Sequence, residues 1–228
     1  MDKLTGLLLT VFLASAVSAE DAAKILLKVT AMDYPPYTAE YLPGYGHSFV
    51  ALQTALSGSD WQAEPLFLPP ARASSWLEKQ DDWLISIFPP GSMAGVELIA
   101  LPGERIPFSL FRLRQPGDFK WNSLSELAGK SVIMTRTPGE TKNIEAYRKA
   151  GIEPVFVNDI EQGMKMLRNQ RGDYLLTTLA TGHFYAKQLD IPLQDIQFAE
   201  TIIRWFPYTI YLNKGHPQAK AIRQVLVP

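Results

Sequence analysis

The sequence contains no cysteine, so a disulfide, a thiol nucleophile and a thiolate metal ligand are all excluded. It also has no basic excess, since 22 Lys and Arg stand against 23 Asp and Glu. Nucleic-acid binding usually needs a basic surface that neutralises phosphates, so we expect no nucleic-acid partner. A hydrophobic content of 46% at a net charge of −1 excludes a disordered chain. We therefore expect a globular protein held together by core packing.

The longest uncharged apolar run lies near the start, from Leu4 to Ala14. It follows a short positively charged start and precedes Val17-Ser18-Ala19, which has the small-residue pattern of a signal-peptidase site. Its length of about eleven residues is well short of the roughly 20 that a helix needs to cross a bilayer. We predict a signal peptide over residues 1–19 and a periplasmic location. A buried N-terminal helix is the alternative.

From Ile25 onward, short apolar runs alternate with amphipathic segments, which is typical of strands interleaved with helices. The expected strands are 25–31, 61–68, 83–88, 106–113, 131–135, 153–157, 174–178 and 202–212. Helices are expected at 49–58, 71–79, 123–129, 141–150, 159–168, 179–187 and 218–227. This order predicts an α/β fold of two lobes, each a mostly parallel sheet flanked by helices.

The alternation predicts a first lobe of residues 24–104 plus 204–228 and a second lobe of residues 105–203. The chain would then cross between the lobes twice, and the two crossings would form a hinge. Ligands of such sheets bind beyond the carboxyl ends of the strands, so we expect the binding site in the cleft between the lobes.

Several motifs occur in an order that is characteristic of one family. They are Asp33-Tyr34-Pro35-Pro36-Tyr37, Trp76 to Ser86, Ser123 to Val132, Gly163 to Leu167 with Gly172-Asp173-Tyr174, and Asn213 to Pro217. In this order they resemble family 3 of the bacterial periplasmic solute-binding proteins, the polar amino-acid binding proteins of ABC importers. The resemblance implies a type II periplasmic-binding fold that captures a small polar solute, such as an amino acid or a small carboxylate. It also implies an ABC permease or a membrane sensor as partner.

The chain departs from the family pattern at both charged ligand contacts. The arginine that grips the ligand carboxylate is missing from the corresponding stretch, 88–94, and the position of the aspartate that takes the ammonium falls near Thr178. The family also normally continues beyond the helix that precedes Pro228. Both charges of a zwitterion need partners when they leave water. We therefore expect a different ligand or a rearranged grip.

Candidate ligand-binding residues in the first lobe lie near the ends of strands. Tyr34 and Tyr37 follow the first strand and resemble the aromatic wall of the family; core packing is the alternative. Phe88 ends the third expected strand. Arg72 begins a helix in a pattern that some relatives of the family share, and a solvated surface arginine is the alternative.

In the second lobe, Arg136, Thr137 and Gly139 occupy a turn between a strand and a helix. The free N–H groups of such a turn suit an anion, and Arg136 could supply the missing guanidinium. Helix capping by Thr137 is the alternative. Thr177 and Thr178 end another strand, where their hydroxyls could bind a neutral ligand or cap the next helix.

The sequence carries no HExxH pair, Gly-x-Ser-x-Gly elbow or glycine-rich phosphate loop, and its three histidines are isolated. We therefore expect a monomeric binding protein that has no enzymatic activity, cofactor or metal. The resemblance leaves two alternatives open, since a few members of the family are periplasmic dehydratases similar to cyclohexadienyl dehydratase. The other alternative is a non-transporting module that binds a protein.

Overall fold

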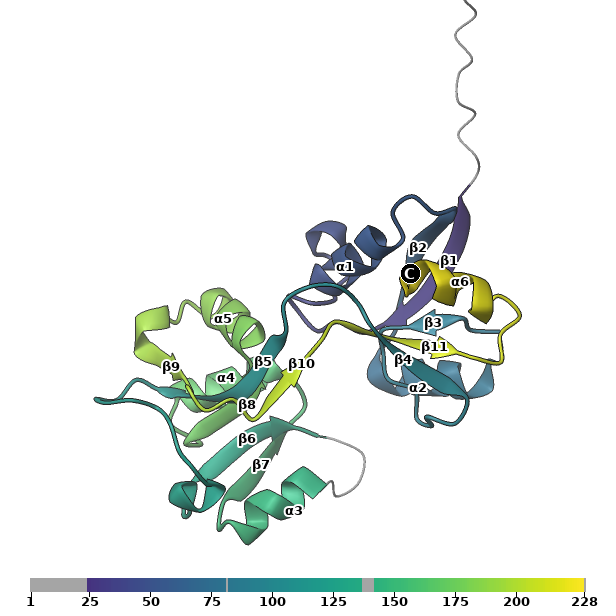
Figure 1. Ribbon diagram of the computed structural model, residues 1–228. Coiled ribbons are helices and arrows are strands. Elements are labelled where there is room, and N and C mark those ends of the chain that lie inside the picture. Colours follow the sequence, from purple (N-terminus) through teal and green to yellow (C-terminus); the bar gives the residue numbers. More distant parts are fainter. Residues whose placement is uncertain (1–23, 81, 137–141, 228) are drawn as a thin grey trace, which may run out of the picture.

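The computed structural model describes residues 24–80, 82–136 and 142–227 (Figure 1). The expected signal peptide, Thr137 and Gly139 lie outside these residues. Within them, no helix is long and apolar enough to span a membrane.

The first sheet has the strand order β2-β1-β3-β11-β4. Its strands are β1 (Ile25–Ala31), β2 (Trp61–Phe67), β3 (Ile85–Ser86), β4 (Val96–Ala100) and β11 (Thr209–Asn213), and its helices are α1 (His47–Ala55), α2 (Pro70–Lys79) and α6 (Ala219–Leu226), with a 3-10 turn η1 at Pro43–Tyr45. Strand β1 pairs in parallel with β2 and β3, whereas β11 runs antiparallel to β3 and β4. Leu52 of α1 and Ile222 of α6 pack with Val29 and Ile85 in one core. We call this part of the chain the first lobe.

The second sheet has the strand order β10-β5-β8-β6-β7, with β9 also paired to β5. Its strands are β5 (Ile106–Leu113), β6 (Ser131–Thr135), β7 (Glu153–Val157), β8 (Tyr174–Thr178), β9 (Ile196–Phe198) and β10 (Arg204–Phe206), and its helices are α3 (Lys142–Lys149), α4 (Ile160–Arg168) and α5 (Leu179–Gln188), with 3-10 turns η2 (Leu124–Leu127) and η3 (Leu193–Asp195). Strand β6 is parallel to β7 and β8, whereas β5 is antiparallel to all its partners. We call this part the second lobe.

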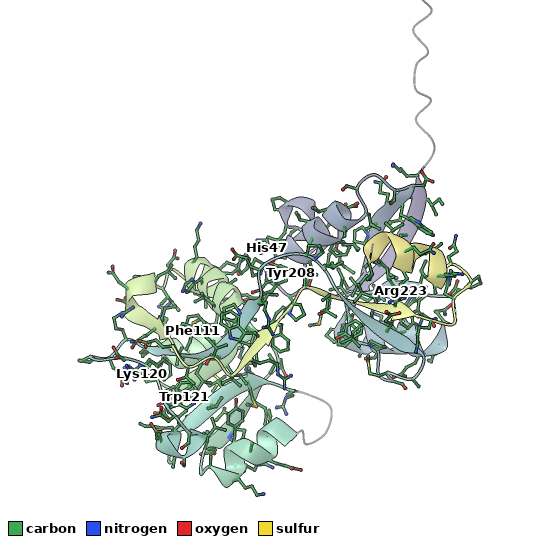
Figure 2. All side chains as sticks on the ribbon, viewed as in Figure 1. His47, Phe111, Lys120, Trp121, Tyr208 and Arg223 are labelled. Carbon is green, nitrogen blue, oxygen red and sulfur yellow. The ribbon has the colours of Figure 1, made fainter. Side chains whose placement is uncertain are left out.

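Neighbouring residues of the second sheet face two different cores, as the period of two in a strand requires. Leu110 and Val132 pack with Trp121 in one core, whereas Phe111 and Ile133 pack in the other. Figure 2 labels Phe111 and Trp121 within this lobe. Burial on both faces explains why strands β5 and β6 carry consecutive apolar residues, such as Leu110-Phe111 and Val132-Ile133.

The predicted α/β fold of two helix-flanked sheets, parallel at their centres, is confirmed. The expected single strand 202–212 is broken instead at Pro207 into β10 and β11. Proline lacks the N–H that would continue the ladder. As a result Arg204–Phe206, expected in the first lobe, pair with β5 of the second sheet. The lobe boundaries are otherwise still predictions.

The chain crosses between the two sheets at residues 101–105 and again at 207–208, and the two crossings lie side by side (Figure 1). The Leu101 amide donates a 2.7 Å hydrogen bond to the Tyr208 carbonyl. Gly103 has a φ of 143°, and a Cβ added there would lie 2.9 Å from Cδ2 of the Tyr208 ring. The crossings are therefore joined to each other, and the glycine leaves room for the tyrosine.

The motif residues of the second lobe have a structural role. Asp173, at the start of β8, accepts hydrogen bonds from the Ser131 amide at 2.8 Å, the Ser131 hydroxyl at 2.9 Å and Lys130 Nζ at 3.1 Å. Burial alone would raise the pKa of Asp173, but these hydrogen bonds and the Lys130 charge outweigh it and hold the pKa below its ordinary value. The aspartate therefore fastens the start of β8 to the start of β6.

Candidate functional site

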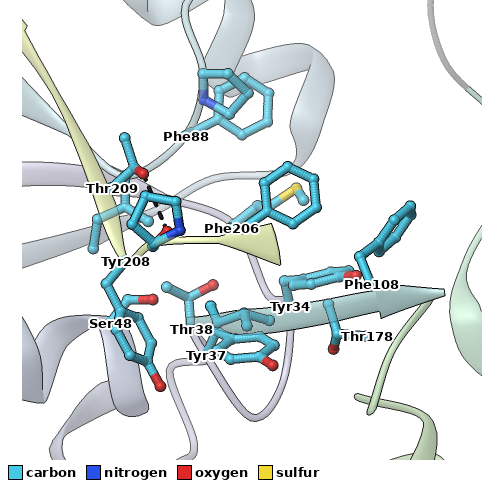
Figure 3. Close-up of a pocket in the computed structure, with 15 residues that line it drawn as sticks. Tyr34, Tyr37, Thr38, Ser48, Phe88, Phe108, Thr178, Phe206, Tyr208 and Thr209 are labelled. Carbon is cyan, nitrogen blue, oxygen red and sulfur yellow. Dashed lines mark hydrogen bonds between the residues drawn. The ribbon is translucent and has the colours of Figure 1, made fainter. Parts of the chain in front are cut away.

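A pocket of about 310 Å³ lies between the two lobes, beside the chain crossings (Figure 3). Six of its described lining residues are aromatic: Tyr34, Tyr37, Phe88, Phe108, Phe206 and Tyr208. Four carry a short hydroxyl side chain: Thr38, Ser48, Thr178 and Thr209. The other described lining residues are Met32, Ile87, Pro89, Ile106 and Pro207, so none of the described set is charged.

The loop after β1 carries the two tyrosines and is held by the start of α1. The amide of Tyr34 donates to the Thr38 carbonyl at 2.6 Å, and that of Ser48 donates to the Tyr37 carbonyl at 2.9 Å. Gly46 has a φ of 95°, and a Cβ added there would lie 2.6 Å from the Tyr37 carbonyl oxygen. This close approach requires glycine. The loop is therefore fixed by backbone contacts before any ligand arrives.

Tyr34 belongs to the first lobe but packs against the core of the second lobe that contains Phe111. Burial raises the pKa of Tyr34, and hydrogen bonds of its hydroxyl with Thr177 and Thr181 oppose that rise. The Thr177 contact falls short of full hydrogen-bond geometry, because Thr177 Oγ1 is buried without a well-formed partner in the described parts of the chain. Tyr34 thus bridges the lobes mainly by ring packing.

Tyr37 is only 7% exposed and also reaches the second lobe. Burial raises its pKa to about 12, opposed by a hydrogen bond with Thr178. Its ring lies 6.1 Å from the rings of both Tyr34 and Tyr208. The two alternatives for these tyrosines were core packing and a place on the cleft wall. Each tyrosine combines the two, because it is largely buried and also lines the pocket.

Thr178 has two roles, because it begins α5 and also lines the pocket. Its Oγ1 accepts a hydrogen bond from the Thr181 amide at 3.1 Å and lies 2.9 Å from the Thr181 hydroxyl. Thr178 is therefore the N-cap of α5. Thr177, by contrast, is fully buried and is not among the described lining residues.

The two candidate arginines lie apart from this pocket. Arg72 is exposed in the first turn of α2, and Arg136 is exposed directly after β6, where its amide donates to the Val157 carbonyl. Neither is among the described lining residues. Of the candidates, Tyr34, Tyr37, Phe88 and Thr178 are brought together, and their contact with a ligand is still a prediction.

Sequence reasoning missed Phe108, Phe206 and Tyr208. Phe206 and Tyr208 flank the proline at which the expected long strand breaks, so they were assigned to one continuous strand. The pair of aromatic residues around Pro207 was the available signal. Across residues 24–80, 82–136 and 142–227, no group of three His, Asp or Glu side chains could hold a metal ion.

No family model and no curated protein sequence matches the chain. Solved structures do match it. The GluR0 ligand-binding core in complex with L-glutamate is 16% identical, with a TM-score of 0.66 over 90% of this chain and 92% of that one. A histidine kinase sensor domain with similarity to periplasmic binding proteins is 15% identical, with a TM-score of 0.66 over 89% and 88%.

A third similar structure is holo ArgBP from T. maritima, 16% identical, with a TM-score of 0.58 over 88% of this chain and 87% of that one. At such identities the likeness establishes a shared architecture. It agrees with the order of the motifs, with the two helix-flanked sheets and with the double crossing between them. The chain therefore has the two-lobed periplasmic-binding-protein fold that its motifs predict.

Proposed function

We propose that the protein captures a small solute in the pocket between its lobes. The observation that supports this is the composition of the wall: Tyr37 comes from the first lobe, whereas Phe108 and Thr178 come from the second. A ligand that contacts both walls stabilises the arrangement in which the lobes are close. The volume of about 310 Å³ is at the lower end of the roughly 300–1,000 Å³ typical of small-molecule sites.

The similar structures support a binding role. One is a ligand-binding core in complex with L-glutamate, and another is holo ArgBP. Another is a sensor domain of a histidine kinase. We propose a periplasmic monomer, exported by the signal peptide 1–19, whose ligand-bound form is recognised by a membrane partner. An ABC permease would couple capture to uptake, and a membrane sensor would couple it to signalling.

A binding role fits the pocket better than a dehydratase activity does. General acid–base catalysis needs groups whose pKa lies near the working pH. The described lining offers tyrosines, and burial moves the pKa of both Tyr34 and Tyr37 upward, away from neutrality. Its other polar groups are serine and threonine hydroxyls with no histidine or carboxylate among the described lining residues.

The test is a thermal-shift panel of amino acids, small carboxylates, sugars and neutral aromatic compounds. A true ligand raises the melting temperature, because binding to the folded state stabilises it by mass action. At a ligand concentration of 100 times the Kd, the free energy of unfolding rises by about 2.7 kcal/mol. Phe108→Ala should abolish the shift, whereas Phe184→Ala, on α5 and outside the described lining, should keep it. A panel without any shift, or a shift that survives Phe108→Ala, would contradict capture in this pocket.

A further inference from the structure

The pocket walls are built from aromatic faces and edges contributed by both lobes. The Phe108 and Phe206 rings are 5.5 Å apart at 76°, and the Tyr37 and Tyr208 rings are 6.1 Å apart at 61°. Such edge-to-face pairs are the preferred packing of aromatic rings. Phe88, two residues after β3, adds a further ring (Figure 3). A flat aromatic molecule can extend this packing.

Charge is absent from the described lining and only reaches its outer margin. The Arg204 guanidinium lies 5.4 Å from the centroid of the Phe206 ring and is exposed. Burial raises the pKa of Tyr208, and the exposed Glu104 carboxylate raises it further. These two charges have opposite signs and are solvated. A carboxylate or ammonium group inside the pocket would therefore lose its water without gaining a partner.

The polar groups that could hold a charged head group are already used within the protein. Thr178 caps α5, the hydroxyls of Thr178 and Thr181 lie 2.9 Å apart, and the hydroxyls of Tyr37 and Tyr34 lie close to these threonines. The two tyrosines thus cover the start of α5, where free amides would otherwise attract an anion. Ser48 and Thr38 still present hydroxyls on the wall, and a hydroxyl can donate to or accept from a neutral group.

We infer that the pocket binds an uncharged aromatic molecule that carries a neutral hydrogen-bonding group, such as an indole N–H or a phenol hydroxyl. This inference rests on the proposed function and narrows its ligand class. It replaces the amino acid or small carboxylate that the family resemblance implies with a solute that brings no formal charge into the pocket.

The test compares four compounds that share one ring and differ in charge: indole, tryptamine, indole-3-acetate and tryptophan. Calorimetric titration of the full chain at pH 7 should detect indole binding with a 1:1 stoichiometry. Tryptamine, indole-3-acetate and tryptophan should each bind at least tenfold more weakly, because each must desolvate a charge. The shared ring makes this ratio a measure of charge selection rather than of ring size.

Substitutions then place the site. Phe88→Ala should weaken indole binding at least tenfold, and Phe88→Leu, which keeps apolar volume without a ring, should weaken it less. Phe184→Ala is the matched control and should bind indole as the unmodified protein does. Circular dichroism of each variant separates lost binding from lost folding, and Phe88→Leu carries the test if Phe88→Ala unfolds.

Each outcome has one meaning. A charged analogue that binds as tightly as indole overturns the uncharged class and leaves solute capture standing. Indole binding that survives both Phe88 substitutions overturns the assignment to this pocket. If none of the four compounds binds and the thermal-shift panel finds only a charged or non-aromatic ligand, this inference fails alone; if the panel finds no ligand, the proposed function fails with it.

Discussion

Tyr37 places an ionisable hydroxyl in a buried position where the lobes meet. Its folded-state pKa of about 12 lies above the ordinary value of about 10 because burial disfavours the phenolate. A group whose pKa is raised by folding stabilises the fold fully at pH values below its unfolded pKa. That contribution is lost as the pH rises from about 10 towards 12.

Tyr37→Phe should therefore make the protein less sensitive to alkali. At neutral pH we expect a loss of at most about 1 kcal/mol, because the hydroxyl that lies close to Thr178 is removed. Between pH 10 and 12 the variant should lose about 2 kcal/mol less than the unmodified protein. Part of the alkaline loss should persist, since burial also raises the pKa of Tyr147 and Tyr185 to about 12. Urea unfolding across this pH range measures both effects.

Tyr45→Phe is the matched control, because Tyr45 is 42% exposed and its ring contacts would be retained. It should follow the unmodified protein at every pH. An unchanged alkaline profile in Tyr37→Phe would mean that the Tyr37 hydroxyl is already solvated.

Strands β6 and β8 are fastened at their first residues by a single carboxylate. Asp173 holds the amide and hydroxyl of Ser131, which begins β6, and its pKa lies below the ordinary value as a result. A group whose pKa is lowered by folding stabilises the protein above its unfolded pKa of about 4. That contribution is lost as the pH falls through the folded value.

Asp173→Ala should lower the free energy of unfolding by about 1 kcal/mol at pH 7, because the Ser131 groups lose their partner and the site is partly exposed. The difference from the unmodified protein should shrink as the pH falls below 4. Asp195→Ala, which removes an exposed carboxylate, should change little at either pH. If the difference in the free energy of unfolding between this variant and the unmodified protein stayed constant across the acid range, the Asp173 charge would have no role in it.

The elements themselves were largely predictable, because their apolar residues follow the period of a strand or a helix. Periodicity could not predict the break between β10 and β11, since the apolar pattern continues through Pro207 while the chain changes sheets. Periodicity also could not predict that β5 and β11 run antiparallel to their neighbours, because each enters its sheet from a crossing rather than after a helix.

Within the site, the paired prolines after β1 marked Tyr34 and Tyr37, because a rigid loop at a strand end is a local signal. Phe108 had no such signal, since only the tertiary arrangement brings it to the pocket. Arg136 was expected at the ligand on the analogy of a family charge. It lies exposed directly after β6 and is not among the described lining residues, so its contact with a ligand is still a prediction.

At the scale of the whole molecule, the lobes meet through the tyrosine loop as well as through the crossings. Tyr34 is anchored to the first lobe by its backbone bonds to Thr38, while its ring packs on the core of the second. Aromatic burial of this kind contributes roughly 1.5–3 kcal/mol. This contact therefore favours the arrangement of the lobes described above.

Tyr34→Ala should loosen that arrangement. We expect a larger radius of gyration by small-angle X-ray scattering and faster hydrogen exchange at the Thr181 amide, which lies under the tyrosine. Tyr45→Ala is the control, since Tyr45 is 42% exposed and its ring contacts are with Phe49 and Phe67 of the first lobe, and both readouts should stay unchanged. Equal radii for the Tyr34 variant and the unmodified protein would show that the crossings alone hold the lobes.

The bond between Leu101 and Tyr208 ties the outgoing and returning chain into a single pivot. Torsion in one crossing must be shared by the other, which favours rotation about one axis over independent swivelling. Tyr208 belongs to the returning crossing, and its ring also forms part of the pocket wall. A solute that contacts this ring would also contact the joined crossings. Ligand binding and the angle between the lobes would then be coupled through one side chain.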